Sequence, residues 1–336
     1  YGLPLEIIEE IAEEERFGVD RDGFEAALKE QRQRSRSSGA ASRRQLQRVG
    51  DEVTAARLET TAFVGYDRLE VADAAVALLV STDDDATATV EALGEGESGV
   101  VVLATTPFYA ESGGQIGDRG RLRWEGGEAA VLDTQKTPAG VTLHEVQVES
   151  GTLRDDASVV TVVDASLRAP TERNHTATHL LHAALRHVLG TNVRQAGSLV
   201  APDRLRFDFT HSRPVSDDEL ETIEALVNRW ILAAEPTEIV PERAFQEAVD
   251  AGAMALFGEK YGDSVRTVAV PALPLEDDDR LSSLELCGGC HVGNTGEIGP
   301  FLVSSERGVA SGVRRIEALT GEGAQAHWQH QRDLLR

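Results

Sequence analysis

The chain has 336 residues, of which 41% are hydrophobic, so it is too long for one ordinary core and fits two or three folded domains. Its formal net charge of -24 argues against a nucleic-acid partner, which normally meets Lys and Arg. No segment reaches the ~18 uncharged apolar residues of a membrane span. Two cysteines cannot build a disulfide-rich secreted domain. We therefore expect a cytoplasmic protein with no membrane partner.

Residues 1–59 predict a helical segment. Apolar residues recur every three or four positions over 5–15 and 24–58, and Asp22 is a suitable N-cap for the second run. That run is rich in arginine, whose guanidinium forms bidentate contacts with phosphate, so one face could contact an RNA backbone. A solvated helix with ordinary ion pairs explains the pattern equally well. The arginines are Arg32, Arg34, Arg36, Arg43, Arg44 and Arg48.

Residues 60–168 predict an all-β unit, most simply a small barrel. Short β-branched runs alternate there with Gly-rich turns, which is typical of strands joined by hairpins. The expected strands include Val100–Thr105, Ala130–Asp133, Val141–Val148 and Val159–Val163.

Residues 169–321 predict a mixed α+β domain. We expect a helix that begins after Pro170, a strand over Arg204–Thr210 and an amphipathic helix from Asp217 to about residue 234. Residues 322–336 predict the start of another helix. The fold class is therefore α+β and multi-domain. Because residues 1–4 include neither a start Met nor a signal peptide, we expect a piece of a longer protein.

Two distant segments carry side chains that suit one metal ion. His175 and His179 stand at i and i+4 of the expected helix and project from one face. Cys287 and His291 lie on a Gly-rich turn that can wrap an ion. A mixed nitrogen and sulfur set selects zinc over magnesium or calcium. Each half alone has an ordinary alternative, because helical His pairs are common and Cys-Gly-Gly-Cys also suits redox chemistry or packing. His182 is expected on the helix surface, with a supporting contact to the metal site as the alternative.

A Gly-rich segment over residues 107–118 is a second candidate site. Gly113 and Gly114 let backbone N–H groups approach a ligand, and Glu111, Gln115 and Asp118 supply polar contacts. It lacks the Lys-Ser/Thr ending of a phosphate loop. On spacing alone, a β-hairpin turn is the simpler interpretation.

Four motifs together resemble the editing domain of alanyl-tRNA synthetases, in the family's order. They are His-Thr-Ala-Thr-His-Leu-Leu-His over 175–182, Arg-Gln-Ala-Gly-Ser-Leu over 194–199, Leu-Phe-Gly-Glu-Lys-Tyr-Gly-Asp over 256–263 and Cys-Gly-Gly-Cys-His-Val over 287–292. Residues 111–118 and 312–318, the latter with Arg314 and Arg315, fit the same family. The resemblance implies that residues 1–59 end a tRNA-recognition domain, that 169–321 form the editing core, and that the activating and C-terminal domains are absent.

The resemblance further implies hydrolysis of the ester that joins Ser or Gly to the 3′ end of tRNA(Ala). It assigns the amino-acid pocket to Thr178, Gln195 and Ser198. It assigns substrate or tRNA contacts to Glu111, Gly113, Gly114, Gln115, Asp118, Arg314 and Arg315. It also implies that the full-length protein is an alanine-tRNA ligase, which could form oligomers.

Several points stay open from the sequence. Zinc could activate water and polarise the ester, could fix the amino group of the substrate, or could be closed by four protein ligands. Cys290 stands where the family usually has Thr and could compete for the metal. The alternatives are a zinc-braced tRNA-binding module without catalysis, and an editing protein of the threonyl type or the freestanding AlaX type, which share the His-x3-His and Cys-x3-His pattern.

Overall fold

The computed structural model describes residues 47–58, 60–82, 87–254, 261–275, 280–334 and 336. Residues 47–55 are helical, and Val49 and Val53, one turn apart, pack against the barrel described below. This confirms the end of the second expected helix. The expected helix over 5–15, the start of the second one and its arginines other than Arg48 lie outside the described residues.

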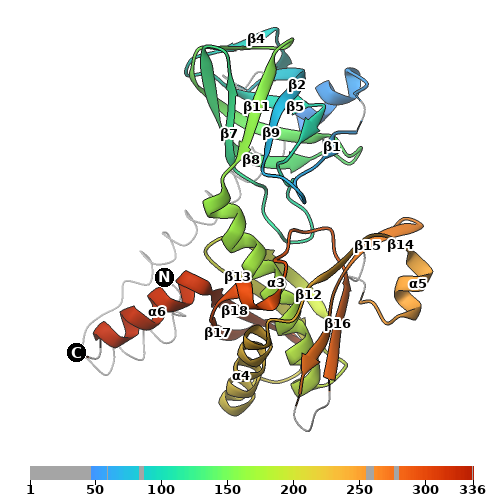
Figure 1. The fold of residues 1–336 in the computed structure, drawn as a ribbon, viewed down its shortest axis with the longest axis vertical. Coiled ribbons are helices and arrows are strands. Elements are labelled where there is room, and N and C mark those ends of the chain that lie inside the picture. Colours follow the sequence, from blue (N-terminus) through green and yellow to red (C-terminus); the bar gives the residue numbers. More distant parts are fainter. Residues whose placement is uncertain (1–46, 59, 83–86, 255–260, 276–279, 335) are drawn as a thin grey trace, which may run out of the picture.

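Six antiparallel strands close a small barrel, as expected for residues 60–168 (Figure 1). Their order is β11-β7-β8-β9-β5-β2, and pairing of β11 with β2 closes the ring. Alternate side chains fill the interior, among them the fully buried Leu79, Val101 and Leu122. The barrel strands are β2 (Glu70–Ser81), β5 (Ser98–Leu103), β7 (Gly120–Trp124), β8 (Gly127–Lys136), β9 (Thr142–Ser150) and β11 (Ser158–Val163).

Five shorter strands complete the β unit. β3 pairs with β2, β1 pairs with β6 in parallel, and β10 pairs with β4. They are β1 (Ala62–Phe63), β3 (Ala88–Thr89), β4 (Ala92–Gly94), β6 (Thr105–Thr106) and β10 (Thr152–Arg154).

One long helix, α3 (Ala165–Leu189), leads directly from the last barrel strand into the second domain (Figure 1). The expectation that this helix begins after Pro170 is wrong. The Asp164 side chain accepts a hydrogen bond from the Ser166 N–H and caps the helix earlier. Pro170 removes only the bond to a carbonyl of the first turn, and that loss is tolerated near a helix start.

A four-stranded antiparallel sheet, β12-β13-β18-β17, carries α3 and α4 and forms the second core. Phe207, Trp230 and Ile316 are fully buried between these layers. Ser216 and Glu219 form a capping box at the start of α4. The expected strand over 204–210 and the expected helix from Asp217 are confirmed. The elements are β12 (Gln195–Val200), β13 (Leu205–Thr210), α4 (Asp217–Ala233), β17 (Phe301–Ala310) and β18 (Val313–Thr320).

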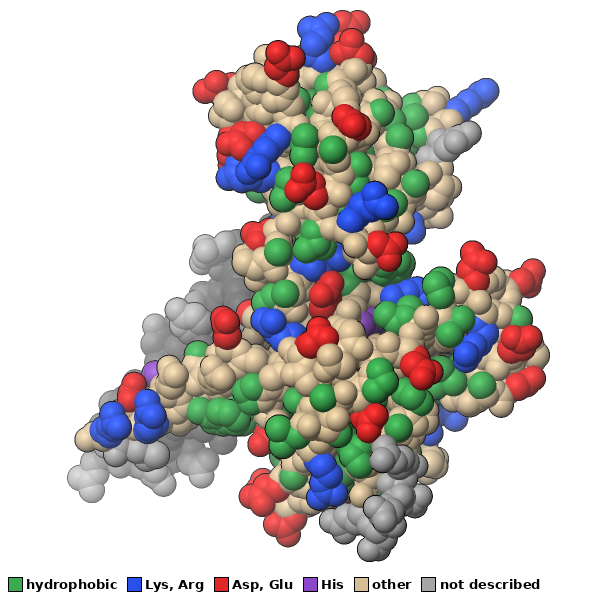
Figure 2. Space-filling view, viewed as in Figure 1, with side chains coloured by type: hydrophobic (Ala, Val, Ile, Leu, Met, Phe, Trp, Pro, Cys, Tyr) green, Lys and Arg blue, Asp and Glu red, His purple; other side chains and the backbone are tan. Residues whose placement is uncertain are grey.

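A three-stranded sheet, β14-β15-β16, lies beside α3 and ends at the turn that carries Cys287 (Figure 1). Its elements are β14 (Glu238–Ala244), α5 (Phe245–Asp250), β15 (Ser264–Pro274) and β16 (Arg280–Leu286), followed by the 3-10 helix η3 (Thr295–Ile298). The final helix α6 (Gly321–Leu334) confirms the expected last helix. Among the described residues, no helix is long and apolar enough to cross a membrane. Acidic and basic side chains are interspersed on the face shown in Figure 2.

Candidate metal centre

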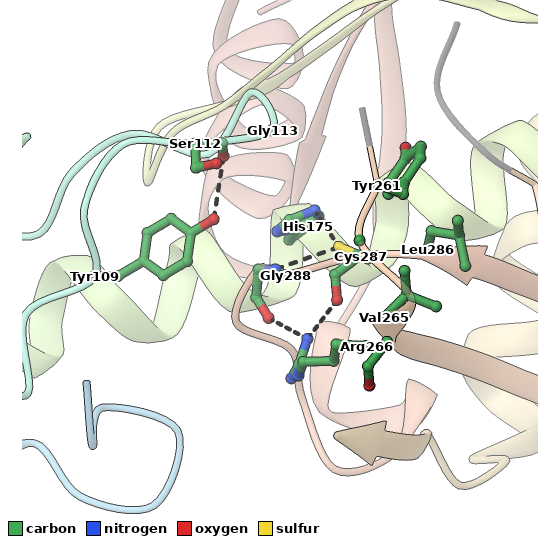
Figure 3. A pocket seen from close by; sticks show the side chains of 13 residues that line it. Tyr109, Ser112, Gly113, His175, Tyr261, Val265, Arg266, Leu286, Cys287 and Gly288 are labelled. Atoms are coloured by element: carbon green, nitrogen blue, oxygen red, sulfur yellow. Dashed lines mark hydrogen bonds between the residues drawn. The ribbon is translucent and has the colours of Figure 1, made fainter. Parts of the chain in front are cut away.

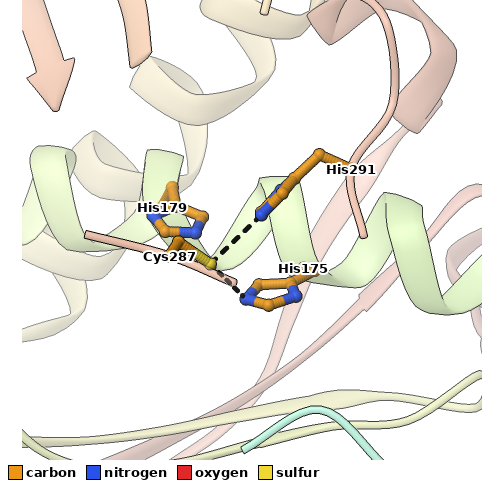
Figure 4. Close-up of side chains that lie close together, drawn as sticks. All are labelled: His175, His179, Cys287 and His291. Carbon is orange, nitrogen blue, oxygen red and sulfur yellow. Dashed lines mark hydrogen bonds between the residues drawn. The ribbon is translucent and has the colours of Figure 1, made fainter. Parts of the chain in front are cut away.

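Four side chains from two distant segments converge on one point (Figure 4). His175 and His179 come from successive turns of α3, and Cys287 and His291 come from the turn after β16. One ligand atom from each lies within 4.8 Å of all the others. The Cys287 Sγ is 3.4 Å from His175 Nε2 and 3.3 Å from His291 Nε2. The structure therefore brings together all four expected metal ligands.

The far nitrogen of His175 meets a side chain of the barrel. His175 Nδ1 lies 2.8 Å from the Oε1 of Gln115, and the backbone N–H of Cys290 donates to the same oxygen over 2.8 Å. Gln115 is fully buried. This contact leaves Nε2 as the nitrogen of His175 that faces the sulfur of Cys287.

The far nitrogen of His179 meets a buried carboxylate. His179 Nδ1 lies 2.8 Å from Glu285 Oε2, and His182 Nδ1 lies 3.0 Å from the other oxygen of Glu285. His179 Nε2 is buried and has no hydrogen-bond partner among the described residues. The expectation of a surface position for His182 is wrong, because its side chain is buried against Phe207 and Glu285.

The Nδ1 of His291 also contacts a side chain outside the group of four. Its Nδ1 lies 3.1 Å from the hydroxyl oxygen of Thr176, which also accepts the backbone N–H of Val292 at 3.2 Å. Each of the three imidazoles thus has its Nδ1 near a different side chain, by an ion-pair contact rather than a hydrogen bond in the case of His179, and Nε2 is left for the centre. Such outer partners orient metal-binding histidines and fix their tautomers.

Electrostatics favour a thiolate at Cys287. Burial raises the pKa of this thiol, but the imidazoles of His175, His291 and His179 outweigh burial and lower it well below its usual value. Burial lowers the pKa of His179, whereas Glu285 and Cys287 raise it, with a net value of about 10. Burial and the nearby His175 lower the pKa of His291 to about 3. A thiolate among imidazoles matches the charge that a divalent cation requires.

Gly289 makes room for the centre. A Cβ at this position would lie 2.0 Å from His175 Cε1, 2.3 Å from its Nδ1 and 2.8 Å from Gln115 Oε1. The turn can approach the imidazole this closely only because residue 289 has no side chain. Together with the unpartnered Nε2 of His179, this packing fits a small cation held by three nitrogens and one sulfur.

A cavity of about 270 Å³ opens beside Cys287 and His175 (Figure 3). Tyr109, Ser112 and Gly113 of the barrel loop line one side, and Tyr261 and Val265 line the other. Arg266 donates hydrogen bonds to the carbonyls of Cys287 and Gly289 at 2.8 and 2.9 Å and stacks on Tyr66. The centre is therefore accessible from a pocket between the two domains.

The expected Gly-rich segment is both a hairpin turn and part of this site. Ser112 and Gln115 pair across a turn whose centre is Gly113 and Gly114, with φ of 61° and 88°. A Cβ on Gly114 would meet the backbone and Cβ of Ser198 at 2.9 Å, so the glycine lets the loop pack on β12. Gly113 lines the cavity, whereas Glu111 is exposed and accepts a hydrogen bond from Gln135.

Asp118 serves an internal contact in the structure. Its carboxylate pairs with the guanidinium of Arg168, which also donates to the carbonyls of Gly65 and Pro107. Both side chains are buried. The pair joins the barrel loop to the first turn of α3, and its burial leaves this carboxylate little room to reach RNA.

The remaining expected residues are not in the cavity wall formed by the described residues. Thr178 is buried on α3 and donates to the Asn174 carbonyl at 2.8 Å. Gln195 and Ser198 are half-buried on β12. Arg314 and Arg315 form bidentate pairs with Glu306 and Asp208. Their roles in substrate binding stay predictions.

Cys290 is not in the group of four ligands. Its side chain is buried, and burial raises the pKa of its thiol to about 12. Sequence reasoning missed Glu285 and Thr176 as partners of the ligands. The role of Thr176 could have been suspected from the sequence, since it lies next to His175 on the same predicted helix. The role of Glu285 could not have been suspected, because Leu284-Glu285-Leu286 reads as ordinary strand alternation.

Two models of known protein families match separate parts of the chain. A family model described as tRNA synthetases class II (A) matches residues 1–167. Another, described as threonyl and alanyl tRNA synthetase second additional domain, matches residues 265–317, which include Cys287 and His291. Together these matches assign the chain to the class II aminoacyl-tRNA synthetases.

Individual relatives narrow the family. Alanine--tRNA ligase of Thermus thermophilus is 55% identical over 329 residues, which cover 96% of this chain and 36% of that protein. The enzymes named alanine--tRNA ligase of Thermotoga maritima and Bacillus subtilis are each 47% identical over 100% of this chain and 37% and 36% of their own length. The chain belongs to the alanyl-tRNA synthetase family and spans a little over a third of these relatives.

Proposed function

We propose that this chain binds zinc and hydrolyses tRNA(Ala) mischarged with Ser or Gly, as the editing part of an alanine-tRNA ligase. The observation that carries the proposal is a four-ligand His/Cys centre that opens into a cavity between the barrel and the α+β domain. The family membership supports tRNA(Ala) as the partner. This activity belongs to translation and agrees with the cytoplasmic location expected from the sequence.

Zinc is the proposed metal because three imidazoles and one thiolate suit its tetrahedral preference. His175, His179, Cys287 and His291 would hold it. When bound, zinc would supply positive charge close to the ester of the substrate, and it would act as a Lewis acid only with a coordination position beyond these four ligands. Gln115, Glu285 and Thr176 would orient the imidazoles, because each already contacts an Nδ1.

The cavity is proposed to receive the aminoacylated 3′ end. Its volume of about 270 Å³ lies near the lower end of small-ligand pockets, so it suits a single terminal residue rather than a duplex. Tyr261, half-buried in the cavity wall, offers aromatic surface for a base, and base stacking on such rings contributes ~1–3 kcal/mol. The backbone of Gly113 is the proposed loop contact.

The proposed site would distinguish Ser-tRNA(Ala) from the correct Ala-tRNA(Ala) by the hydroxyl of the Ser side chain. A site that hydrogen-bonds the Ser hydroxyl leaves its own polar groups unpaired when Ala is bound, and Ala is then rejected. Thr178, Gln195 and Ser198 are the proposed partners because of the family resemblance, although the cavity wall formed by the described residues does not include them. Thr178 Oγ1 donates its proton to Asn174, so its oxygen lone pairs are directed to accept a further donor.

A zinc-braced tRNA-binding module without catalysis is the second candidate. The observation that favours it is the presence of four protein ligands, since structural zinc sites are closed in this way. Against it stands the cavity beside Cys287 and His175, which a purely structural site does not need. An editor of the threonyl or AlaX type is less favoured, because the relatives that match the whole chain are alanine--tRNA ligases.

The test is hydrolysis of Ser-tRNA(Ala), Gly-tRNA(Ala) and Ala-tRNA(Ala) by the purified chain, with and without prior removal of metal. Selective release of Ser or Gly that is lost with the metal supports editing. Zinc binding and tRNA binding without release of any amino acid would instead support the structural module. The same assay is run with Ser-tRNA(Thr). Faster release of Ser from Ser-tRNA(Thr) than from Ser-tRNA(Ala) would assign the chain to the threonyl type.

A further inference from the structure

Gln115 is the one side chain of the described barrel residues that donates or accepts a hydrogen bond at a ligand imidazole. Its Oε1 lies 2.8 Å from His175 Nδ1 on α3 and 2.8 Å from the backbone nitrogen of Cys290 on the ligand turn. The side chain is fully buried. A single oxygen therefore connects the barrel with both ligand-bearing segments.

These contacts fix the tautomer of His175. A backbone N–H can only donate, so the Gln115 atom that faces Cys290 must be the carbonyl oxygen and not the amide nitrogen. The same oxygen can only accept from His175, which places the imidazole proton on Nδ1. The Nε2 lone pair then faces the sulfur of Cys287, as metal binding requires.

The barrel loop holds Gln115 in this position through its backbone. Ile116 N donates to the Val200 carbonyl at 3.1 Å, and Val200 N donates to the Gly114 carbonyl at 2.7 Å. The loop is thus bound to the end of β12. Gln115 can reach His175 only while this loop is docked, since the tight turn over 112–115 sets its direction.

We infer that Gln115 is a positioning residue through which docking of the barrel sets the metal affinity of the centre. The inference rests on the proposed zinc centre but not on the deacylation reaction. Outer partners of this kind change metal affinity by about 10–100-fold when they are removed. The barrel is therefore part of the metal centre, although all four metal ligands lie outside it.

The experiment compares the Zn²⁺ affinity of the parent chain and of the variants Gln115→Leu, Gln115→Asn and Gln115→Glu, by competition with a chromophoric chelator. Leu removes the acceptor, Asn withdraws it by one methylene, and Glu retains an oxygen that can accept from both donors. The absorption of bound Co²⁺ gives a second readout of the thiolate ligand and of tetrahedral geometry. Circular dichroism of each metal-free protein checks the fold, and Gln115→Asn carries the test if Gln115→Leu does not fold.

Tyr66→Phe is the matched control, because it removes a different barrel–core hydrogen bond, from Tyr66 to the Gly288 carbonyl at 2.5 Å. We expect Leu and Asn at position 115 to weaken Zn²⁺ binding about 10–100-fold, with the Tyr66 variant close to the parent and Glu binding at least as tightly as the parent, because its carboxylate adds negative charge beside the cation. Parent-like affinity for Leu and Asn would overturn the inference, as would an equal loss in Glu or in Tyr66→Phe. A parent that binds no zinc would overturn it together with the metal centre, whereas zinc binding without Ser release would reject only the proposed reaction.

Discussion

Gly289 lies against the imidazole of His175 so closely that a Cβ would stand 2.0 Å from its Cε1. The preceding residue, Gly288, faces open space, where a Cβ would meet nothing within 4 Å. The two glycines of this turn therefore differ in how much space they leave for a side chain. Gly289 is required by the packing of the metal centre, and Gly288 is not.

Gly289→Ala is expected to weaken zinc binding about 5–140-fold, because overpacking of ~1–3 kcal/mol must displace His175 or the turn. Gly288→Ala is the control and is expected to bind zinc like the parent. Chelator competition at one pH measures both. Equal affinity in the two variants would contradict the packing described for Gly289.

Glu285→Ala is expected to weaken zinc binding about 10–100-fold, because His179 loses the carboxylate that orients its Nδ1. His182→Leu leaves the contact between Glu285 and His179 in place and is expected to bind zinc much more tightly than Glu285→Ala. Zinc affinities of both variants provide the measurement. The orienting role of Glu285 is rejected if the His182 variant loses as much affinity as the Glu285 variant.

Asp118→Ala is expected to destabilise the protein by up to about 3–5 kcal/mol, because it leaves the buried guanidinium of Arg168 with only the more distant carboxylate of Glu172 at 3.6 Å. Glu149→Ala removes an exposed partner of Arg121 and is expected to cost less than about 1 kcal/mol. Chemical denaturation of the two metal-free variants gives the comparison. A small effect at Asp118 with a loss of tRNA affinity would show that this carboxylate contacts RNA instead.

His144 makes the stability of the barrel depend on pH. It is fully buried between the Val101 carbonyl and the Thr106 hydroxyl, and burial lowers its pKa from 6.5 to about 4. The unfolded chain therefore binds a proton that the folded barrel does not, and stability is full above pH 6.5 and falls between pH 6.5 and 4. The loss reaches about 3 kcal/mol at the lower end.

Denaturation curves at several pH values, for the parent and for His144→Gln, isolate this contribution. The variant is less stable at neutral pH but is expected to lose less stability on acidification, because Gln does not titrate. Identical pH slopes for the two proteins would show that His144 does not carry the effect.

Local pattern predicted the barrel, α3, α4 and α6, but not the three-stranded sheet β14-β15-β16 or the strands β12, β17 and β18. The β-branched runs became barrel strands, and the apolar spacing after Asp217 became α4, because both signals arise from neighbours in sequence. The predicted start of α3 was wrong because Pro170 was taken as the boundary, whereas the side chain of Asp164 caps the helix. A helix boundary can be predicted from sequence only when possible N-cap residues are compared with nearby prolines.

The four side chains of the candidate metal centre were predictable, whereas two of their three partners, Gln115 and Glu285, were not. His175 and His179 share a helix face, and the Cys-Gly-Gly-Cys-His turn completes a zinc-type set, so residue type and spacing were sufficient. Gln115 and Glu285 reach the centre only through the folding of the barrel loop and of β16. The burial of His182 has the same origin, since Glu285 and Phe207 cover it from other elements.

Release of Ser from Ser-tRNA(Ala), measured beside Ala-tRNA(Ala) with zinc content determined on the same samples, tests the central claim most directly. Cys287→Ala removes a proposed ligand, and Cys290→Thr is its control, since Cys290 lies outside the ligand group. We expect the parent and Cys290→Thr to contain zinc and to release Ser but not Ala, and Cys287→Ala to lose both zinc and Ser release. Undiminished Ser release by Cys287→Ala, or zinc-loaded parent protein that binds Ser-tRNA(Ala) without releasing Ser, would contradict the proposed editing function.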